Sequence, residues 1–217
     1  MRLPSEAGDT SLALYTDSSP NGFKATIALE ELGLAYRLHH VQIGAGDHRQ
    51  PSFLRLNPHG RIPVLVDSQN GVTLFESAAI LLYLAERSGK LLPSDTKSRW
   101  SAIQWLIFHA ASVGPLMGQR VHFEISSDTA QPAVIDHFRR LNIAAFDTLD
   151  RHLSEHRYFA GEEYSVADIA HFGWSHIARI VGFDFSDWQH LSAWHERVAA
   201  RPAVQRGIQR PAAATEA

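Results

Sequence analysis

The first part of the chain alternates short apolar runs with a helical period. Residues 11–15 (SLALY) form an apolar run before a turn-rich segment, and residues 36–43 alternate in polarity, so both predict strands. Between them, residues 20–32 repeat apolar positions at helical spacing, with Pro20 in the first helical position and Gly33 directly after the last. A helical crossover between two strands favours a parallel pair.

The next segment predicts a hairpin and a second helix. Residues 61–67 (RIPVLVD) and 72–75 (VTLF) are apolar runs separated by Gln-Asn-Gly at 69–71, a typical hairpin turn, so we expect an antiparallel pair. Residues 77–88 are helical by period and end before a glycine. Residues 11–89 therefore predict an α/β domain with a mixed four-stranded sheet and helices on its faces.

After the proline-containing connection at 91–95, the strand signal almost disappears. Four helical stretches follow, at 96–123, 131–156, 165–180 and 188–200. The third begins with an acidic capping box formed by Ser165 and Asp168. The pattern predicts an all-α domain at 96–202, followed by a tail at 203–217.

Composition excludes several classes of function. The 217 residues carry a formal net charge of -3, so there is no basic excess for a nucleic-acid partner. The chain has no cysteine, so any thiol chemistry must use a thiol that a ligand supplies. No metal-binding motif such as HExxH occurs, and we expect no metal. No secretory signal and no membrane-length apolar stretch occur either, so we expect a soluble cytoplasmic protein without a membrane partner.

The first candidate site is the start of the helix at Pro20. Ser19 is expected to be its N-cap, and Asn21 adds an amide donor one residue inside. The helix N-terminus carries partial positive charge, so these groups together could stabilise an anion such as a thiolate. A turn with an ordinary cap explains the same residues, and the residues alone leave both interpretations open.

The second candidate is Ile62-Pro63, at the start of an apolar strand. A proline inside such a run belongs at a strand start or in an unusual peptide. A cis bond would present the amide and carbonyl of Ile62 to an extended ligand, which could pair with them as an added strand does. An ordinary trans proline at a sheet edge is the alternative.

The third candidate is Glu76-Ser77, where a strand passes into a helix. Ser77 and the first helical amides can hold a carboxylate, and Glu76 can accept from an ammonium. Side by side they could bind both charges of an amino-acid head group. The alternative is a second N-cap with an acid that suits the helix dipole.

In the order of its motifs, the chain resembles the glutathione transferase superfamily. The resemblance covers residues 11–202 and rests on SSPNG, RIPVLVD, LFESAAILLYLAE and YSVADIA. Pro-Asn-Gly in the first loop, LMGQ at 116–119 and His-Phe at 122–123 are most similar to the bacterial nu class. The resemblance implies a thioredoxin-like first domain, an α-helical bundle as the second, and a homodimer.

The resemblance also implies where glutathione, the co-substrate, would bind. Its cysteinyl backbone would pair with Ile62 beside a cis Pro63, and its γ-glutamyl head would lie on Glu76 and Ser77. Its sulfur would lie near Ser19 and Asn21. Its glycine end would lie near His59 or Arg61.

Some positions depart from the nu class or leave a choice. His48 stands where the class has a glutamine that touches the ligand, and His137 stands where it has an arginine that meets a glutathione carboxylate. These two changes leave open whether one or two glutathiones bind. Ser18 stands at the catalytic position of theta- and delta-like classes, so both serines are candidates, with Ser19 favoured.

Three functions follow from the resemblance. The nu-like motifs favour reduction of disulfide bonds or peroxides by the bound thiolate with a second glutathione. Conjugation of glutathione to small hydrophobic electrophiles is the first alternative. A non-catalytic binding or structural role on the same fold is the second.

Overall fold

Four strands form one mixed sheet in the computed structural model, which describes residues 11–129 and 131–211. The strand order is β2-β1-β3-β4, with β1 parallel to β2 and β3 antiparallel to both β1 and β4. The bounds are β1 Leu12–Thr16, β2 Arg37–His40, β3 Val64–Asp67 and β4 Val72–Phe75. The predicted parallel and antiparallel pairs are both confirmed.

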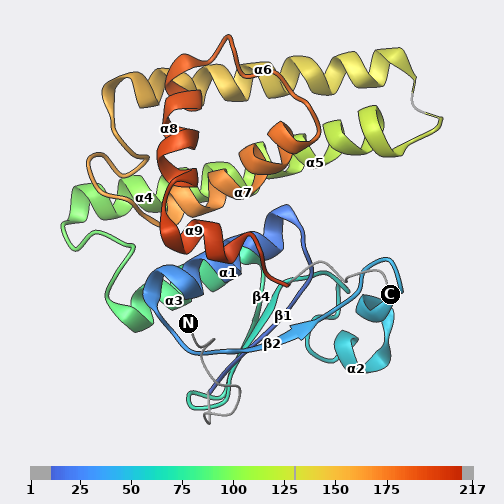
Figure 1. Cartoon of the computed structure of the whole chain (residues 1–217), viewed down its shortest axis with the longest axis vertical. Coiled ribbons are helices and arrows are strands. Elements are labelled where there is room, and N and C mark those ends of the chain that lie inside the picture. Colours follow the sequence, from blue (N-terminus) through green and yellow to red (C-terminus); the bar gives the residue numbers. More distant parts are fainter. Residues whose placement is uncertain (1–10, 130, 212–217) are drawn as a thin grey trace.

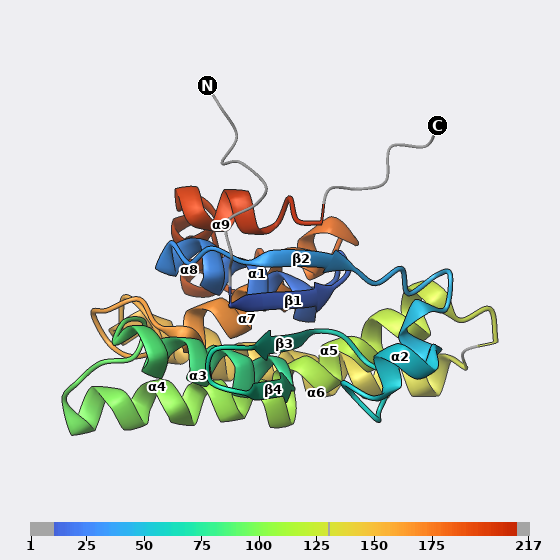
Figure 2. The same ribbon diagram turned by 90° about the horizontal axis from the view of Figure 1, so that it is seen from below.

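Helices cover the sheet, and the helical part of the chain lies beyond them (Figure 1). α1 (Pro20–Leu32) and α3 (Ser77–Ser88) lie between the sheet and the helical part, whereas α2 lies at one end of the sheet, as Figure 2 also shows. α2 spans Pro51–Leu54 and follows the 3-10 turn η1 at Asp47–Arg49. This arrangement is the thioredoxin-like first half that the resemblance implies.

The helical part contains one long helical stretch with two π-helical turns. α4 continues through η2 into α5 and then η3. The predicted helix at 96–123 is therefore present, and η2 and η3 are π-helical turns within this helical stretch. π-helical turns often occur at functional sites. The bounds are α4 Thr96–Phe108, η2 His109–Val113, α5 Gly114–Val121, η3 His122–Ser126, α6 Pro132–Glu155, α7 Val166–Ile180 and α8 Gln189–Ala199.

The last helix lies at the start of the predicted tail. α9 (Pro202–Gly207) packs on α1, where Thr26 Oγ1 donates to the carbonyl of Gly207 at 2.8 Å. A Cβ on Gly207 would lie within 3.0 Å of the backbone of Ile27, so the two helices touch through their main chains. Residues 203–207 of the predicted tail thus belong to a helix that packs on α1. The expected leader at 1–10 and the end of the expected tail, 212–217, lie outside the described residues.

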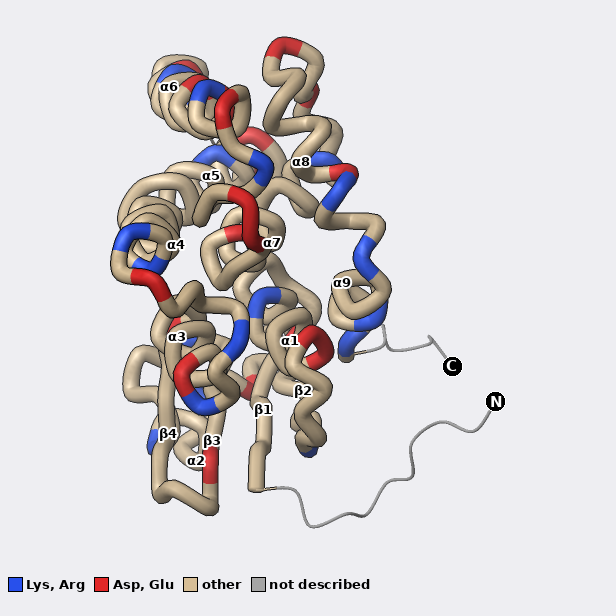
Figure 3. The backbone as a smooth tube through the Cα atoms, turned by 90° about the vertical axis from the view of Figure 1, so that its left-hand side faces the viewer, with Lys and Arg blue, Asp and Glu red and all other residues tan. Residues whose placement is uncertain are grey.

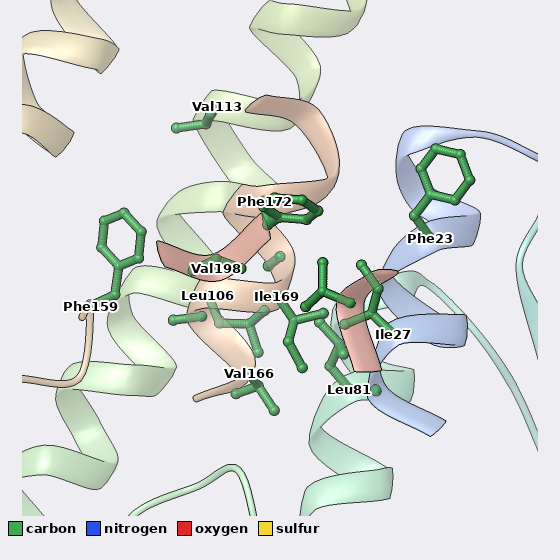
Figure 4. Close-up of a cluster of buried hydrophobic side chains, with 14 of the residues drawn as sticks. Phe23, Ile27, Leu81, Leu106, Val113, Phe159, Val166, Ile169, Phe172 and Val198 are labelled. Carbon is green, nitrogen blue, oxygen red and sulfur yellow. The ribbon is translucent and has the colours of Figure 1, made fainter. Parts of the chain in front are cut away.

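The larger of two apolar clusters joins the sheet side to the helical side. Ile27 of α1, Leu81 of α3, Leu106 of α4 and Phe172 of α7 are all fully buried in one cluster (Figure 4). Each such side chain contributes about 2 kcal/mol by leaving water. The core therefore holds α1 firmly between the two halves. We keep the division into domains at 11–89 and 96–202 as a proposal.

Basic and acidic residues are interspersed along the backbone in both the sheet part and the helical part (Figure 3). Within residues 11–129 and 131–211, no helix is both long and apolar enough to cross a membrane.

Candidate functional site

The sheet register brings the three candidate segments to the same end of the sheet. Tyr15 of β1 pairs with Val64 of β3, and Val64 pairs with Phe75 of β4. The chain leaves β1 toward Ser19, enters β3 from Pro63 and leaves β4 toward Glu76. Since β1 and β4 both run antiparallel to β3, these three segments follow or precede neighbouring strands at the same end of the sheet. Ser19 and Pro63, which are 44 residues apart in sequence, thus come to the same end of the sheet.

Ser19 is the N-cap of α1, as expected. Its backbone is extended (φ -155°), and its Oγ accepts from the amide of Gly22 at 3.0 Å. With its lone pair used in the cap, the hydroxyl hydrogen is available for an acceptor outside the helix. Ser18 points elsewhere, because its Oγ donates to the carbonyl of Pro211 at 3.1 Å.

Asp17 fixes the loop that carries both serines. Its carboxylate accepts from the amide of Ser18 at 2.8 Å, from the amide of Ile43 at 3.0 Å and from His40 Nε2 at 2.9 Å. Partial burial raises the pKa of Asp17, but the hydrogen bonds from Ile43 and His40 outweigh it and bring the pKa below its usual value. The sequence analysis missed this residue, although an Asp in a Ser- and Pro-rich turn is a recognisable signal.

Asn21 lies in the first turn of α1, and its side chain accepts a hydrogen bond from a buried lysine. Lys24 Nζ donates to Asn21 Oδ1 at 2.8 Å, and Lys24 is only 2% exposed. Burial lowers the pKa of Lys24 to about 7, while the carboxylate of Glu76 acts to raise it. Sequence reasoning missed Lys24 because a single cation in an apolar helix is normally placed on the solvent side.

The peptide bond between Ile62 and Pro63 is cis, as expected. The loop before it is held by buried Asn57, whose Nδ2 donates to the carbonyl of Arg61 at 2.6 Å and whose Oδ1 accepts from the amide of His59 at 2.9 Å. Gly60 adopts a positive φ of 65° in the same loop. Asn57 was missed as well, since its role depends on this closed loop.

Glu76 and Ser77 form the junction of β4 and α3. Glu76 has a φ of 73°, a region that non-glycine residues rarely adopt and that concentrates at functional sites. It occupies the N-cap position, but its side chain makes no capping hydrogen bond, and Ser77 begins the helix. Glu76 is exposed and Ser77 is half-buried, so a carboxylate and the uncapped first turn of α3 adjoin one another at this junction.

The remaining predicted residues fall into two groups. His59 and Arg61 are exposed on the Asn57 loop, and the backbone of His48 packs against Gly60 of that loop. His137, by contrast, is exposed on α6, where its ring packs on Phe138 with centroids 5.4 Å apart. Among the described residues, no hydrogen bond or ring contact joins His137 to the other candidates.

A cavity of about 540 Å³ lies between β2 and α2. His39, Phe53 and Arg55 line it, and none of the predicted site residues does. Within the described ranges, no group of three or more His, Asp or Glu side chains gathers to hold a metal ion.

The comparison with known families decides the identity of this arrangement. Residues 18–87 match the glutathione S-transferase N-terminal domain, and residues 109–202 match the glutathione S-transferase C-terminal domain. The chain belongs to the glutathione S-transferase family. The transferase is 36% identical over 200 residues to the disulfide-bond oxidoreductase YfcG of Escherichia coli, covering 90% of this chain and 93% of the relative. It is 34% identical over 215 residues to YghU, another disulfide-bond oxidoreductase of that organism, covering 92% and 75%.

Solved structures agree with the family. A glutathione transferase from Burkholderia graminis with two glutathione molecules bound per subunit matches the transferase with a TM-score of 0.90 and 33% identity, covering 96% of this chain and 91% of that one. One from Pseudomonas putida with one glutathione disulfide bound per subunit matches with a TM-score of 0.88 and 35% identity, covering 96% and 94%.

Proposed function

We propose that this transferase binds glutathione at the end of the sheet where the three candidate segments meet. It would stabilise the glutathione thiolate and use that thiolate, with a second glutathione, to reduce disulfide bonds. The observation that carries the proposal is the convergence of the α1 N-terminus, the cis Ile62–Pro63 bond and the Glu76-Ser77 junction at that end of the sheet. The relatives named for disulfide-bond oxidoreductase activity, and the similar structure holding glutathione disulfide, favour this reaction over others.

Glutathione is a peptide with two carboxylates, an ammonium and a thiol, and the residues present fit it. The Ile62 backbone would pair with its cysteinyl residue as a strand does. Ser77 and the first amides of α3 would hold the γ-glutamyl carboxylate, while Glu76 would accept from the ammonium. The exposed cation of Arg61, together with His59 and His48, would bind the carboxylate at the glycine end of glutathione.

The sulfur would lie at the N-terminus of α1. The Ser19 hydroxyl and the Asn21 amide would donate to the thiolate, and the helix end would add partial positive charge. Each unit by which they lower the thiol pKa corresponds to about 1.4 kcal/mol of differential stabilisation. The bond from Ser18 to Pro211 supports Ser19 over Ser18 for this role.

The proposed reaction proceeds by two exchanges. The bound thiolate attacks one sulfur of the substrate disulfide, forms a glutathione mixed disulfide and releases the other half as a thiolate. A second glutathione thiolate then attacks the glutathione sulfur, which gives glutathione disulfide and releases the second half of the substrate. The sum is two glutathiones oxidised and one disulfide reduced to two thiols. Since the chain has no cysteine, both attacking thiols belong to glutathione.

With a hydroperoxide in place of the disulfide, the products of the proposed reaction are glutathione disulfide, an alcohol and water.

We also propose a homodimer in the cytoplasm. Large apolar side chains on β4 and α4 are exposed in the single chain, at Phe75, Trp100 and Ile107, and a partner surface would cover them. The cytoplasm supplies the reducing glutathione pool that the reaction needs. Light scattering at micromolar concentration is expected to give twice the 24.2 kDa of one chain, and the monomer mass would contradict the proposal.

The decisive experiment combines binding and turnover. Calorimetric titration with glutathione and with glutathione disulfide should register binding, and hydroxyethyl disulfide should be reduced in a coupled assay. A model electrophile assayed in parallel separates conjugation from reduction. Binding with turnover of the electrophile alone would favour a conjugating enzyme. No binding of either glutathione form would favour a non-catalytic scaffold and overturn the proposal.

A further inference from the structure

A buried chain of hydrogen bonds runs from Asn21 into the helical part of the protein. Lys24 Nζ is 2.8 Å from Asn21 Oδ1 and 2.7 Å from Nε2 of His109. His109 Nδ1 is 3.4 Å from Nδ1 of His171, and Nε2 of His171 is 3.1 Å from the carbonyl oxygen of Trp105. Lys24, His109 and His171 are all at most 2% exposed.

The chemistry of these groups fixes the direction of every hydrogen bond. A carbonyl oxygen only accepts, so His171 carries its hydrogen on Nε2 and accepts on Nδ1. His109 must then donate from Nδ1, which leaves Nε2 as the acceptor for Lys24. Burial holds the pKa of both imidazoles below the usual value, so both are neutral.

The same reasoning fixes the side chain of Asn21. In its protonated form Lys24 is an ammonium that can only donate, so the carbonyl oxygen of the Asn21 carboxamide faces it. The planar group then directs its NH₂ branch away from the lysine. A hydrogen bond accepted from a cation also polarises the amide and makes its N–H groups better donors.

Close helix packing holds the lysine in place. A Cβ on Gly173 of α7 would lie 3.2 Å from Cγ and 3.3 Å from Cε of Lys24, so α7 covers the lysine stem. A Cβ on Gly114 would lie 3.2 Å from Nε2 of His109. His109 itself lies in the π-helical turn η2. Glu76, from the β4–α3 junction, acts to raise the pKa of Lys24, whereas Lys24 helps to lower the pKa of the imidazoles of His109 and His171.

We propose that Lys24 is a positioning residue for the glutathione sulfur, because its ammonium, held by His109, fixes the Asn21 carboxamide with its NH₂ group available to the thiolate. The inference rests on the proposed function, in which Asn21 donates to that thiolate. It adds that the helical domain, through His109 and His171, sets the donor geometry of a residue in the thioredoxin-like domain.

The first test is Lys24→Met, which removes the ammonium and keeps the length of the side chain. The ultraviolet absorbance of the bound thiolate, followed against pH, should show the pKa of the bound thiol raised by about one unit, a tenfold change in the ionisation constant. The kcat for hydroxyethyl disulfide should fall about tenfold. The affinity for S-methylglutathione, which has no thiol to ionise, should stay within about twofold of wild type. If wild type binds neither glutathione nor S-methylglutathione, the proposed function fails; if it binds both and Lys24→Met leaves the thiol pKa unchanged, only this inference fails.

The second test is a double-mutant cycle. In an Asn21→Ala background, Lys24→Met should shift the thiol pKa by much less than it does in wild type, because the carboxamide it orients is gone. An equal shift in both backgrounds would mean that the ammonium acts on the sulfur directly and would overturn the positioning role.

A pair of substitutions at His109 tests the same chain without touching Lys24. His109→Leu removes the acceptor and should raise the thiol pKa, whereas His109→Gln, which keeps an acceptor, should raise it less. His195→Gln is the matched control, since His195 is another buried histidine, paired with Ser175 Oγ at 2.9 Å, and is expected to affect stability but not the thiol. Equal effects of the two His109 variants would contradict the proposal.

Discussion

The carbonyl oxygen of Pro20 and the Cα of Gly173 lie so close together that no side chain fits between them. A Cβ on Gly173 would approach that oxygen to less than 3.0 Å. Pro20 is the first residue of α1, directly after Ser19, and Gly173 lies in the middle of α7. At this point, α1, the helix that carries the proposed thiolate site, therefore contacts α7 of the helical domain through backbone atoms.

Gly173→Ala should consequently disturb both stability and catalysis. Backbone atoms cannot move aside cheaply, so we expect a loss of about 1–3 kcal/mol in the free energy of unfolding and a lower kcat for hydroxyethyl disulfide. Denaturant unfolding and the coupled assay measure the two effects. Gly118→Ala on α5 is the control, because its Cβ would make ordinary contacts with Trp174, at 3.4 Å or more. Equal stabilities of the two variants would contradict this account of the helix contact.

Ser19→Ala should slow turnover more than Ser18→Ala. The Ser19 hydroxyl is the proposed donor to the thiolate, whereas the Ser18 hydroxyl is engaged by Pro211. Loss of the N-cap should also lower the free energy of unfolding by about 1 kcal/mol. Steady-state kinetics with saturating glutathione measures the first effect. A silent Ser19→Ala beside a crippled Ser18→Ala would transfer the role to Ser18.

Ser77→Ala should weaken glutathione binding about tenfold, the loss expected for one hydrogen bond to a charged group. The kcat at saturation should change little, since Ser77 is proposed to touch the head group and not the sulfur. Calorimetry measures the dissociation constant. Ser154→Ala is a suitable control, because Ser154 is exposed on α6 and bonds only the carbonyl of Arg151 in its own helix. Unchanged affinity in Ser77→Ala would remove Ser77 from the site.

Acid should destabilise the protein through its buried histidines. Burial lowers the pKa of His171 to about 3, whereas an unfolded chain has a histidine pKa near 6.5. As pH falls from about 6.5 toward 3, the unfolded state binds a proton that the folded state does not, so the free energy of unfolding falls. At pH 5 His171 alone should cost about 2 kcal/mol relative to pH 7. Urea unfolding across this range should show a shallower decline in His171→Gln, and an unchanged slope would contradict the assignment.

Asp168→Ala should be among the more destabilising single changes. Its carboxylate accepts from the backbone amide of Ser165, the amide of Phe159 and Nε1 of Trp194, all buried. Removing it leaves these donors without a partner and breaks the capping box, at a cost of about 3 kcal/mol or more. Asp184→Ala offers a matched comparison, because Asp184 is exposed and caps only a loop serine. A similar midpoint of denaturant unfolding in both variants would contradict the prediction.

Local pattern was sufficient to predict most of the fold. The parallel pair β1–β2, the hairpin β3–β4 and the capping box of α7 each depend on residues close in sequence, and all three are present. The motif around Pro63 also identified the cis bond, through its resemblance to a known family.

What the sequence did not disclose depends on distant partners. Lys24 and His109 are 85 residues apart, and no periodicity relates them. α9 was missed because six residues are too few to show a helical period, and its burial exists only against α1. Asp17 and Asn57 act by closing loops, so their roles become visible only when the loop geometry is known.

The contact of α9 with α1 has a consequence for the order in which the protein matures. Translation proceeds from the N-terminus, and Gly207 follows Thr26 by 181 residues. During synthesis, the face of α1 that contacts α9 therefore stays uncovered until residues 202–207 have been made. We expect a nascent thioredoxin-like half to remain incomplete on the ribosome, so that the ability to hold glutathione arises late and all at once.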